Sequence, residues 1–389
     1  MDLRSPHSTL TRPPSFDATV QRAHPAMHVA VEATRLLREV RGIGRYVRAL
    51  LPRLLEHRPG LRLTLFAKNR GDAETLRHVM AANPAFDGRL DVRPVREMTK
   101  SRADLFWYPW NHAHPIPALG AVVPTIHDVV PLVNPDPRLL AWQKNLRWRR
   151  RYARTAKRAT LIIADSQFTA DEVHRMLGVS YDRMRVVLLA ADDFSTPPAS
   201  LDVGTLERLG VTRPYVLAVG AADRRKNLGL LERAMPRVVG ALPEATLVLA
   251  GPRRDANGTD INSPWSRTLG FVSDAELAIL YRNAEVLVQP STYEGFGLPV
   301  LEAMQLGTPV ISTRASSLPE VGGDAAIWID PQDDAALADN IIRVMTDEAL
   351  NRSMRAASIA QSARFNWAST ALMTLAVFEE AVLMAAASR

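Results

Sequence analysis

Short apolar runs alternate with longer amphipathic segments along almost the whole chain. Runs rich in β-branched residues predict strands, and apolar residues repeated every three to four positions predict helices, as in Ile43–Leu55. Strands that alternate with helices are typical of parallel sheets covered by helices. The strands predicted in this way are 28–31, 61–67, 91–95, 105–109, 122–126, 160–164 and 185–189, followed by 215–219, 246–250, 285–289, 309–313 and 326–329.

A segment with two prolines and small polar residues, 192–201, interrupts this alternation and is typical of a linker. The pattern therefore predicts an α/β fold of two Rossmann-like, doubly wound lobes, at 27–195 and 196–365. Ligands bind such folds at the carboxyl ends of the strands, so we expect a cleft between the two sheets. The segment 367–386 is amphipathic and could pack on either lobe. Residues 1–26 are rich in Pro, Ser, Thr and Arg and predict a disordered tail without a secretory signal.

Composition restricts the class of protein further. The 389 residues are 47% apolar and 23% charged, which is typical of a soluble globular protein. No run of eighteen apolar residues occurs, so we expect no membrane-spanning helix. The chain has no cysteine, which excludes disulfides, thiolate metal sites and cysteine nucleophiles. Together these features favour a cytoplasmic protein.

Charge is distributed unevenly along the chain. Residues 1–200 contain 31 Lys and Arg against 19 Asp and Glu, whereas residues 201–389 contain 17 against 22. We therefore expect the first half to meet an anionic partner, for which nucleic acid, a membrane leaflet and a phosphorylated acceptor all qualify. The segment Arg138–Arg158 holds nine Lys or Arg and no acidic residue, interleaved with Trp142, Trp148 and Tyr152. Two interpretations stay open, a helix on an anionic membrane surface and a solvated basic helix whose tryptophans pack on the lobe.

The strongest chemical signal is the segment Ser291–Glu302, STYEGFGLPVLE, which follows a predicted strand. Its glycines let the backbone approach a ligand, and the helix that opens at Pro299 offers free amides and a positive dipole end to an anion such as a diphosphate. We expect Glu294 to accept hydrogen bonds from sugar hydroxyls and Glu302 to accept them from a ribose diol. The donor-binding residues predicted in this segment are Gly295, Phe296, Gly297, Leu298 and Glu302.

Two cations, Arg225 and Lys226, follow the predicted strand 215–219 and lie at the edge of the expected cleft. A diphosphate leaving group gains negative charge as its bond to a sugar breaks, and fixed cations stabilise that state more than the intact donor. Across the cleft, Gly42 and Gly44 lie between a strand and a helix, where their amides can face a phosphate. His127 lies at the carboxyl end of another strand, and we expect it to orient the sugar or an acceptor hydroxyl. His112 and His114 are weaker candidates, and no set of residues predicts a metal site.

These segments resemble glycosyltransferase family 4. The likeness rests on the Glu-x7-Glu block, on GIGRY at 42–46 and TIHD at 125–128, and on VGAADRRKNL at 219–228, GFVSDAELAILYRN at 270–283 and TPVISTRASSLPEVGG at 308–323. The resemblance implies a GT-B fold, with 366–389 forming a helix that returns to the first lobe, and it adds Val272 to the donor site. It also implies retaining, metal-independent transfer, with Glu294, His127, Lys226 and Arg225 as catalytic residues. Ala221 follows Gly220 at a position where some relatives have Arg. Whether Arg225 takes over the role of that Arg stays open.

The resemblance also suggests the substrates. It favours a hexosyltransferase that uses GDP-mannose, ahead of UDP-glucose and UDP-N-acetylglucosamine, with no cofactor. The expected acceptor is a glycan or a polyprenyl-linked oligosaccharide in surface polysaccharide or lipopolysaccharide biosynthesis. Such a protein is cytoplasmic and is able to lie on the inner face of the cell membrane through Arg138–Arg158. The base, the acceptor linkage and the oligomeric state are not predicted.

Two alternatives remain. A sugar-nucleotide epimerase of the same fold would also bind the donor, but it would change the sugar without releasing the nucleoside diphosphate. A non-enzymatic polyanion-binding protein would explain the basic first half, but not the two lobes or the acidic second half. The sequence contains no helix-turn-helix, RNA-recognition or zinc pattern, so we do not expect a nucleic-acid partner.

Overall fold

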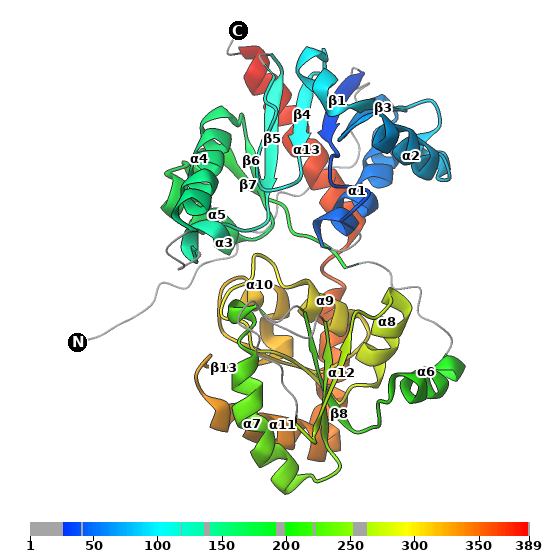
Figure 1. Cartoon of the computed structure of the whole chain (residues 1–389), viewed down its shortest axis with the longest axis vertical. Helices are drawn as coiled ribbons and strands as arrows, with labels where there is room; N and C mark the ends of the chain where they lie inside the picture. Colours follow the sequence, from blue (N-terminus) through cyan, green and yellow to red (C-terminus); the bar gives the residue numbers. More distant parts are fainter. Residues whose placement is uncertain are drawn as a thin grey trace, which may run out of the picture.

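The computed structural model describes residues 26–39, 42–117, 119–135, 141–191, 199–220, 223–251 and 263–387. Two parallel sheets form two lobes stacked along the long axis of the molecule (Figure 1). The strand order is β3-β2-β1-β4-β5-β6-β7 in the first sheet and β10-β9-β8-β11-β12-β13 in the second. Both orders reverse direction beside the first strand of the lobe, as in doubly wound folds. The predicted fold of two Rossmann-like lobes is therefore confirmed.

The first sheet is built from β1 (Met27–Glu32), β2 (Leu61–Ala67), β3 (Leu90–Pro94), β4 (Leu105–Tyr108), β5 (Ala121–Ile126), β6 (Ile162–Ala164) and β7 (Met184–Val186). The second is built from β8 (Tyr215–Val219), β9 (Thr246–Ala250), β10 (Ser266–Gly270), β11 (Val286–Gln289), β12 (Val310–Thr313) and β13 (Ala326–Ile329). Every predicted strand is present. The strand β10 was not predicted, because it pairs only with β9 at the sheet edge and its SRTLG sequence has no apolar run.

Helices cover both sheets. Those of the first lobe are α1 (Ile43–His57), α2 (Arg70–Met80), α3 (Val130–Val133), α4 (Trp142–Arg158) and α5 (Gln167–Leu177). Those that follow are α6 (Asp202–Leu209), α7 (Leu228–Ala241), α8 (Asp274–Asn283), α9 (Leu298–Gln305), α10 (Leu318–Gly322), α11 (Asp334–Thr346), α12 (Glu348–Ser362) and α13 (Trp367–Ala387). The helix α9 begins one residue before the predicted Pro299, because Gly297 caps it with a φ of 109°. The predicted tail, except Ala26, and linker residues 192–198 lie outside the described residues.

The last helix, α13, crosses from the second lobe and packs on the first, against α1, β4 and β5 (Figure 1). Residues Glu348–Ala387, which form α12 and α13, are long and apolar enough by composition to cross a membrane, which the search for an unbroken apolar run did not reveal. The helix α13 also carries apolar residues on its exposed face, namely Leu372 and Leu383. However, Phe378 is fully buried in the first lobe, and Glu379 pairs with Arg58 of that lobe. These contacts are those of a core helix.

Candidate active site

A cavity of about 240 Å³ lies between the lobes, at the carboxyl ends of their strands. Parallel strands that end at the same edge bring the residues after them together, which is why segments distant in sequence meet here. The first lobe contributes Gly42, Ile43, Tyr46, His127, Asp128, Asp165 and Leu189, and the second contributes Arg225, Glu294, Gly295, Phe296, Gly297, Leu298 and Pro299. Of the residues predicted for the site, the cavity wall includes Gly42, His127, Arg225, Glu294, Gly295, Phe296, Gly297 and Leu298.

The carboxylate of Glu294 is held by side chains of the second lobe. Its Oε1 accepts hydrogen bonds from Lys226 Nζ at 2.6 Å, Ser291 Oγ at 2.7 Å and Gln289 Nε2 at 2.9 Å. Its Oε2 lies 3.6 Å from the guanidinium of Arg225. Burial by itself raises the pKa of Glu294, but the charge and hydrogen bond of Lys226, the Ser291 hydroxyl and Arg225 outweigh burial and lower it. Glu294 is therefore a fixed anion, and Lys226 lies one hydrogen bond behind the cavity wall.

The loop that carries Glu294 is held by serines from the loop after β12. Ser316 Oγ accepts a hydrogen bond from the amide of Glu294 at 2.8 Å. Ser317 Oγ lies 2.9 Å from the carbonyl oxygens of both Glu294 and Phe296 and donates to them. Ser316 has a φ of 53°, a left-handed conformation that non-glycine residues seldom adopt, so this support is built at some conformational cost.

The two lobes touch directly at Gly295. A Cβ atom at this position would lie 1.8 Å from the carbonyl oxygen of His127, so only glycine allows this approach. The carbonyl oxygen of Gly295 accepts hydrogen bonds from Ser166 Oγ at 2.7 Å and Thr169 Oγ1 at 3.0 Å. The function of Gly295 is thus a close contact between lobes, in addition to the predicted backbone approach to a ligand.

Glu302 lies outside the cavity wall and joins the two lobes. Its Oε1 accepts a hydrogen bond from Arg45 at 2.8 Å, and its Oε2 accepts one from the hydroxyl of Tyr281 at 2.9 Å. Arg45 also pairs with Asp274 at 2.7 Å. A ribose diol would have to share the carboxylate with Arg45, which the sequence could not indicate because the two residues are 257 positions apart.

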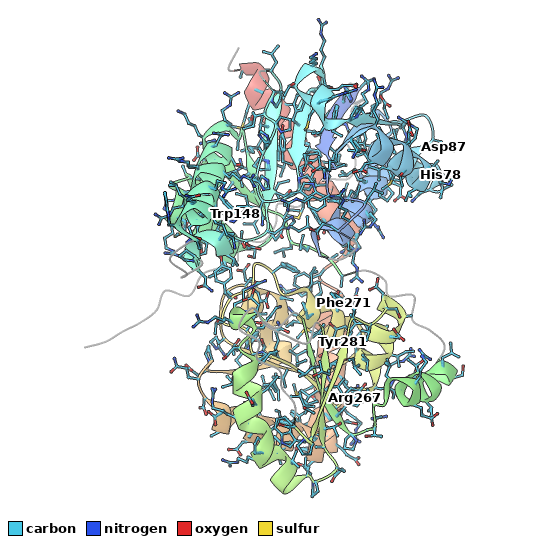
Figure 2. The ribbon with its side chains drawn as sticks, in the orientation of Figure 1. His78, Asp87, Trp148, Arg267, Phe271 and Tyr281 are labelled. Carbon is cyan, nitrogen blue, oxygen red and sulfur yellow. The ribbon has the colours of Figure 1, made fainter. Side chains whose placement is uncertain are left out.

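Gly44 and Val272 also lie outside the cavity wall. Gly44 is buried inside α1, where a Cβ atom would lie 1.6 Å from the carbonyl oxygen of Glu39. Any side chain at position 44 would clash with the backbone of Glu39, which explains the glycine there. Val272 is 5% exposed and follows the end of β10, next to Phe271, which is 76% exposed. Figure 2 shows Phe271 at the edge of the second lobe that is nearest the first.

The imidazole of His127 is enclosed by oxygen acceptors. Its Nδ1 lies 2.5 Å from Asp165 Oδ2, and its Nε2 lies 2.9 Å from the carbonyl oxygen of Pro109. Both nitrogens can donate only in the imidazolium form. Burial by itself lowers the pKa of His127, but the charge and hydrogen bond of Asp165 and the carbonyl of Pro109 raise it above its usual value. Both nitrogens already form hydrogen bonds. One of these bonds would have to break before His127 could contact a sugar or acceptor hydroxyl as predicted.

Asp165 was missed by the sequence analysis. It follows the apolar strand β6 directly, and the reasoning that selected His127 at a strand end applies to it equally. Asp165 lines the cavity and is 1% exposed. Its Oδ1 has no hydrogen-bond partner among the described residues. A buried acceptor without a donor is unusual in a protein interior, which indicates a place for a ligand hydroxyl.

We expect Asp165→Asn to lower the free energy of unfolding by about 2 kcal/mol at neutral pH, because a buried ion pair loses one charge. The raised pKa of His127 stabilises the fold below the unfolded pKa, and this contribution disappears as pH rises through the folded pKa. The deficit of the variant should therefore shrink with rising pH. Urea unfolding across a pH series tests this, with the exposed Asp171→Asn as control. An equal deficit at every pH would contradict the assignment.

The residues that the structure describes contain no group of three or more His, Cys, Asp or Glu that could hold a metal ion. The charged side chains of the cavity wall are Arg225, Glu294, Asp128 and Asp165, with His127 beside Asp165, and Lys226 lies directly behind Glu294. This arrangement can bind an anion of high charge density and hold polar hydroxyl groups beside it.

Comparisons with known proteins agree with this geometry. Residues 40–193 match the family model described as Glycosyltransferase Family 4, and residues 207–361 match Glycosyl transferases group 1. The chain is 30% identical over 275 residues to the O-antigen chain mannosyltransferase B of Escherichia coli, which covers 67% of this chain and 71% of that protein. It is 29% identical over 265 residues to the serotype-specific mannosyltransferase WbdA of Escherichia coli, covering 65% of this chain and 32% of the length of WbdA.

Solved structures share the fold. Sucrose-phosphate synthase from Thermosynechococcus elongatus superimposes with a TM-score of 0.67 over 91% of this chain and 98% of that one, at 20% sequence identity. At this identity the likeness concerns the two-lobe GT-B architecture. The family models and the Escherichia coli relative carry the assignment further. The chain belongs to glycosyltransferase family 4, and it is a glycosyltransferase.

Proposed function

We propose that this enzyme transfers mannose from GDP-mannose to a glycan or polyprenyl-linked oligosaccharide of a surface polysaccharide. We further propose that transfer retains the anomeric configuration and needs no metal ion. The observation that carries the proposal is the pair of cations, Arg225 and Lys226, around the carboxylate of Glu294 in the cavity between the lobes. The same cavity receives the glycine-rich loop that precedes α9.

The diphosphate of the donor would lie against the first amides of α9, with Gly42 and the start of α1 on the opposite wall. As the bond to the anomeric carbon breaks, negative charge builds on the leaving phosphate. Arg225 and Lys226 are already fixed in place by Glu294, so they stabilise this charge without reorganising. These cations supply the charge that a divalent metal would otherwise supply.

Glu294 is better suited to bind the sugar than to attack it. Three donors already bind Oε1, and its lowered pKa reduces its basicity. Oε2 can accept a hydrogen bond from a hydroxyl of the sugar. With no free nucleophile assigned, we propose that the acceptor hydroxyl attacks from the face that the leaving group departs from. The leaving phosphate oxygen takes the proton of this hydroxyl, and attack from the same face gives retention.

Mannose as the transferred sugar is supported by the two Escherichia coli relatives, both of which are mannosyltransferases by name. The first is named for the O-antigen chain, which supports a surface polysaccharide as the product. We expect the nucleotide base to lie beside the segment 252–267, of which residues 252–262 lie outside the described residues.

The test is incubation with GDP-mannose, UDP-glucose and UDP-N-acetylglucosamine, each with and without a mannan acceptor. We expect GDP release and a mannosylated product with the anomeric configuration of the donor, observed by NMR. The rate should not change on addition of EDTA, since Arg225 and Lys226 hold the diphosphate. Inversion, or a rate that EDTA abolishes and Mg²⁺ restores, would contradict the mechanism. An altered sugar nucleotide without GDP release would indicate the epimerase instead.

We also propose that α4 places the enzyme on an anionic membrane. All eight described basic side chains of α4 are exposed: Lys144, Arg147, Arg149, Arg150, Arg151, Arg154, Lys157 and Arg158. Trp142 is 61% exposed and Leu146 is 37% exposed, so apolar groups accompany the cations as at a membrane interface. The competing interpretation is supported by Trp148 and Tyr152, which pack toward the lobe. Arg138 lies outside the described residues.

Reversing Arg147, Arg150 and Arg154 to Glu should move the enzyme from anionic vesicles to solution, because each basic residue near the surface contributes about 1 kcal/mol. Flotation with vesicles of phosphatidylglycerol and phosphatidylcholine measures this shift. The matched control reverses three exposed arginines of the second lobe, Arg233, Arg237 and Arg352, and should float like the wild type. Equal flotation of both variants would refute recruitment by α4.

A further inference from the structure

A second group of cations lies on the first lobe beside the cavity, outside the donor site described above. It consists of Arg35, in the turn after β1, and Arg151, on α4, together with His112 and Trp148. Arg151 Cζ lies 5.5 Å from the ring centroid of Trp148, and the ring of His112 meets the same indole edge-on with centroids 6.0 Å apart. Figure 2 shows Trp148 on α4 of the first lobe. We refer to these four residues as the first-lobe cationic site.

Hydrogen bonds tie this site to the cavity. Trp110 Nε1 donates to the carbonyl oxygen of Glu32 at 2.8 Å, which joins the end of β1 to the segment that carries His112. Asn111, the residue before His112, accepts a hydrogen bond from the amide of His127 at 2.6 Å. Tyr152, the residue after Arg151, donates to the carbonyl oxygen of Asp128 at 3.1 Å. Both His127 and Asp128 line the cavity, so the cationic site is adjacent to it.

Neither Arg35 nor Arg151 forms an ion pair with any residue that the structure describes. The carboxylate of Glu32 bonds to the amide of Thr34, and the charge of Arg35 only partly opposes the rise that burial causes in the pKa of Glu32. Because both arginines lack an ion pair among the described residues, their guanidinium groups remain able to bind an anion.

The state of His112 agrees with an excess of positive charge. Its Nδ1 donates to the carbonyl oxygen of Trp110 at 2.8 Å, which leaves Nε2 as an acceptor in the neutral ring. Burial first, and then the charges of Arg35 and Arg151, lower the pKa of His112 to about 4. His112 is therefore neutral at physiological pH and can accept a hydrogen bond from a hydroxyl group.

We propose that the first-lobe cationic site binds a phosphate or diphosphate group on the acceptor, through Arg35 and Arg151, with His112 accepting from a neighbouring hydroxyl. This proposal rests on the proposed transferase function, because it assigns the ligand to the acceptor. The geometry suits an anion because guanidinium groups bind phosphate oxygens through paired donors. The site belongs to the first lobe, whereas Arg225 and Lys226 belong to the second, so it is separate from the donor diphosphate.

The test is calorimetric titration of the full chain with pyrophosphate and with farnesyl diphosphate, in the presence of saturating GDP. The double variant R35Q/R151Q should bind both probes at least about tenfold more weakly than the wild type, because two charge-assisted contacts are lost. The control R70Q/R96Q removes two exposed arginines from elsewhere in the first lobe and should bind like the wild type. R35K/R151K keeps the charges and should bind more tightly than R35Q/R151Q.

The outcomes separate the sources of the anion. Tighter binding of farnesyl diphosphate than of pyrophosphate, with no binding of farnesol, assigns the site to a lipid-linked acceptor; equal binding assigns it to free phosphate groups. If R35Q/R151Q bound pyrophosphate and farnesyl diphosphate as tightly as the wild type, the proposal would be overturned. The same holds if R35Q/R151Q lost binding to anionic vesicles but still bound pyrophosphate. The affinity for GDP and the slow hydrolysis of GDP-mannose are measured in the wild type and in R35Q/R151Q. If the wild type neither bound GDP nor hydrolysed GDP-mannose, the donor assignment would be refuted, whereas the contrast between R35Q/R151Q and R70Q/R96Q would still decide the anion site.

Discussion

Replacing Lys226 with methionine is expected to lower kcat about 1000-fold while leaving the affinity for GDP-mannose less affected. Lys226 is the cation that binds Glu294 most closely, with Nζ 2.6 Å from Oε1. Its charge matters most when the leaving diphosphate becomes more negative, so its loss raises the barrier more than it weakens the ground state. Steady-state kinetics with GDP-mannose, or with whichever donor the transfer assay selects, measures both quantities.

The same substitution should destabilise the protein, because it leaves Glu294 as a buried carboxylate without its main partner. We expect a loss of about 3 kcal/mol in the free energy of unfolding. The lowered pKa of Glu294 stabilises the wild type above the unfolded pKa, and this contribution disappears as pH falls through the folded pKa. Lys226→Met should lose much of this pH dependence.

Two further variants separate chemistry from folding. Lys226→Met combined with Glu294→Gln removes the unpaired buried charge, so it should recover stability but not activity. Lys226→Arg keeps the charge and should retain more activity than Lys226→Met. If Lys226→Met turned over at close to the wild-type rate, the role assigned to the cation would be refuted.

Replacing Gly295 with alanine is expected to lower kcat about 100-fold through geometry alone, because a displacement of about 1 Å at a reacting centre is enough for such a loss. The new Cβ would lie 1.8 Å from the carbonyl oxygen of His127, and no side-chain rotation relieves a contact between two backbones. Either the loop that carries Glu294 or the lobes themselves must move apart. Both movements separate Glu294 and the start of α9 from the first lobe.

Kinetics and small-angle X-ray scattering together test this expectation. Gly295→Ala should show a lower kcat and, if the lobes separate, a larger radius of gyration. The matched control is Gly204→Ala in α6, where a Cβ atom would meet nothing within 4 Å. It should leave the rate unchanged, and alanine in a helix interior favours stability by up to about 1 kcal/mol. A Gly295→Ala enzyme with wild-type kinetics and scattering would show that this close contact is not needed for turnover.

The local sequence pattern was sufficient to predict most strands and several segments of the site. The alternation of apolar runs and amphipathic segments predicted every strand except β10, because a parallel strand buried on both faces must be apolar along its length. The glycine-rich loop before α9 and the cations after β8 were recognisable because each follows a predicted strand within a few residues. Glu294 and Lys226 were both predicted for the site, and their hydrogen bond follows from the parallel arrangement of β8 and β11.

The tertiary structure decided which groups remain available to a ligand. The sequence places Glu302 one turn into α9, but only the packing of the lobes brings Arg45 to its carboxylate. The sequence places His127 at a strand end, but Asp165 and Pro109 engage both of its nitrogens because β4, β5 and β6 lie side by side. Local propensity depends on neighbours within a few residues, whereas these contacts depend on how two separately formed sheets are positioned.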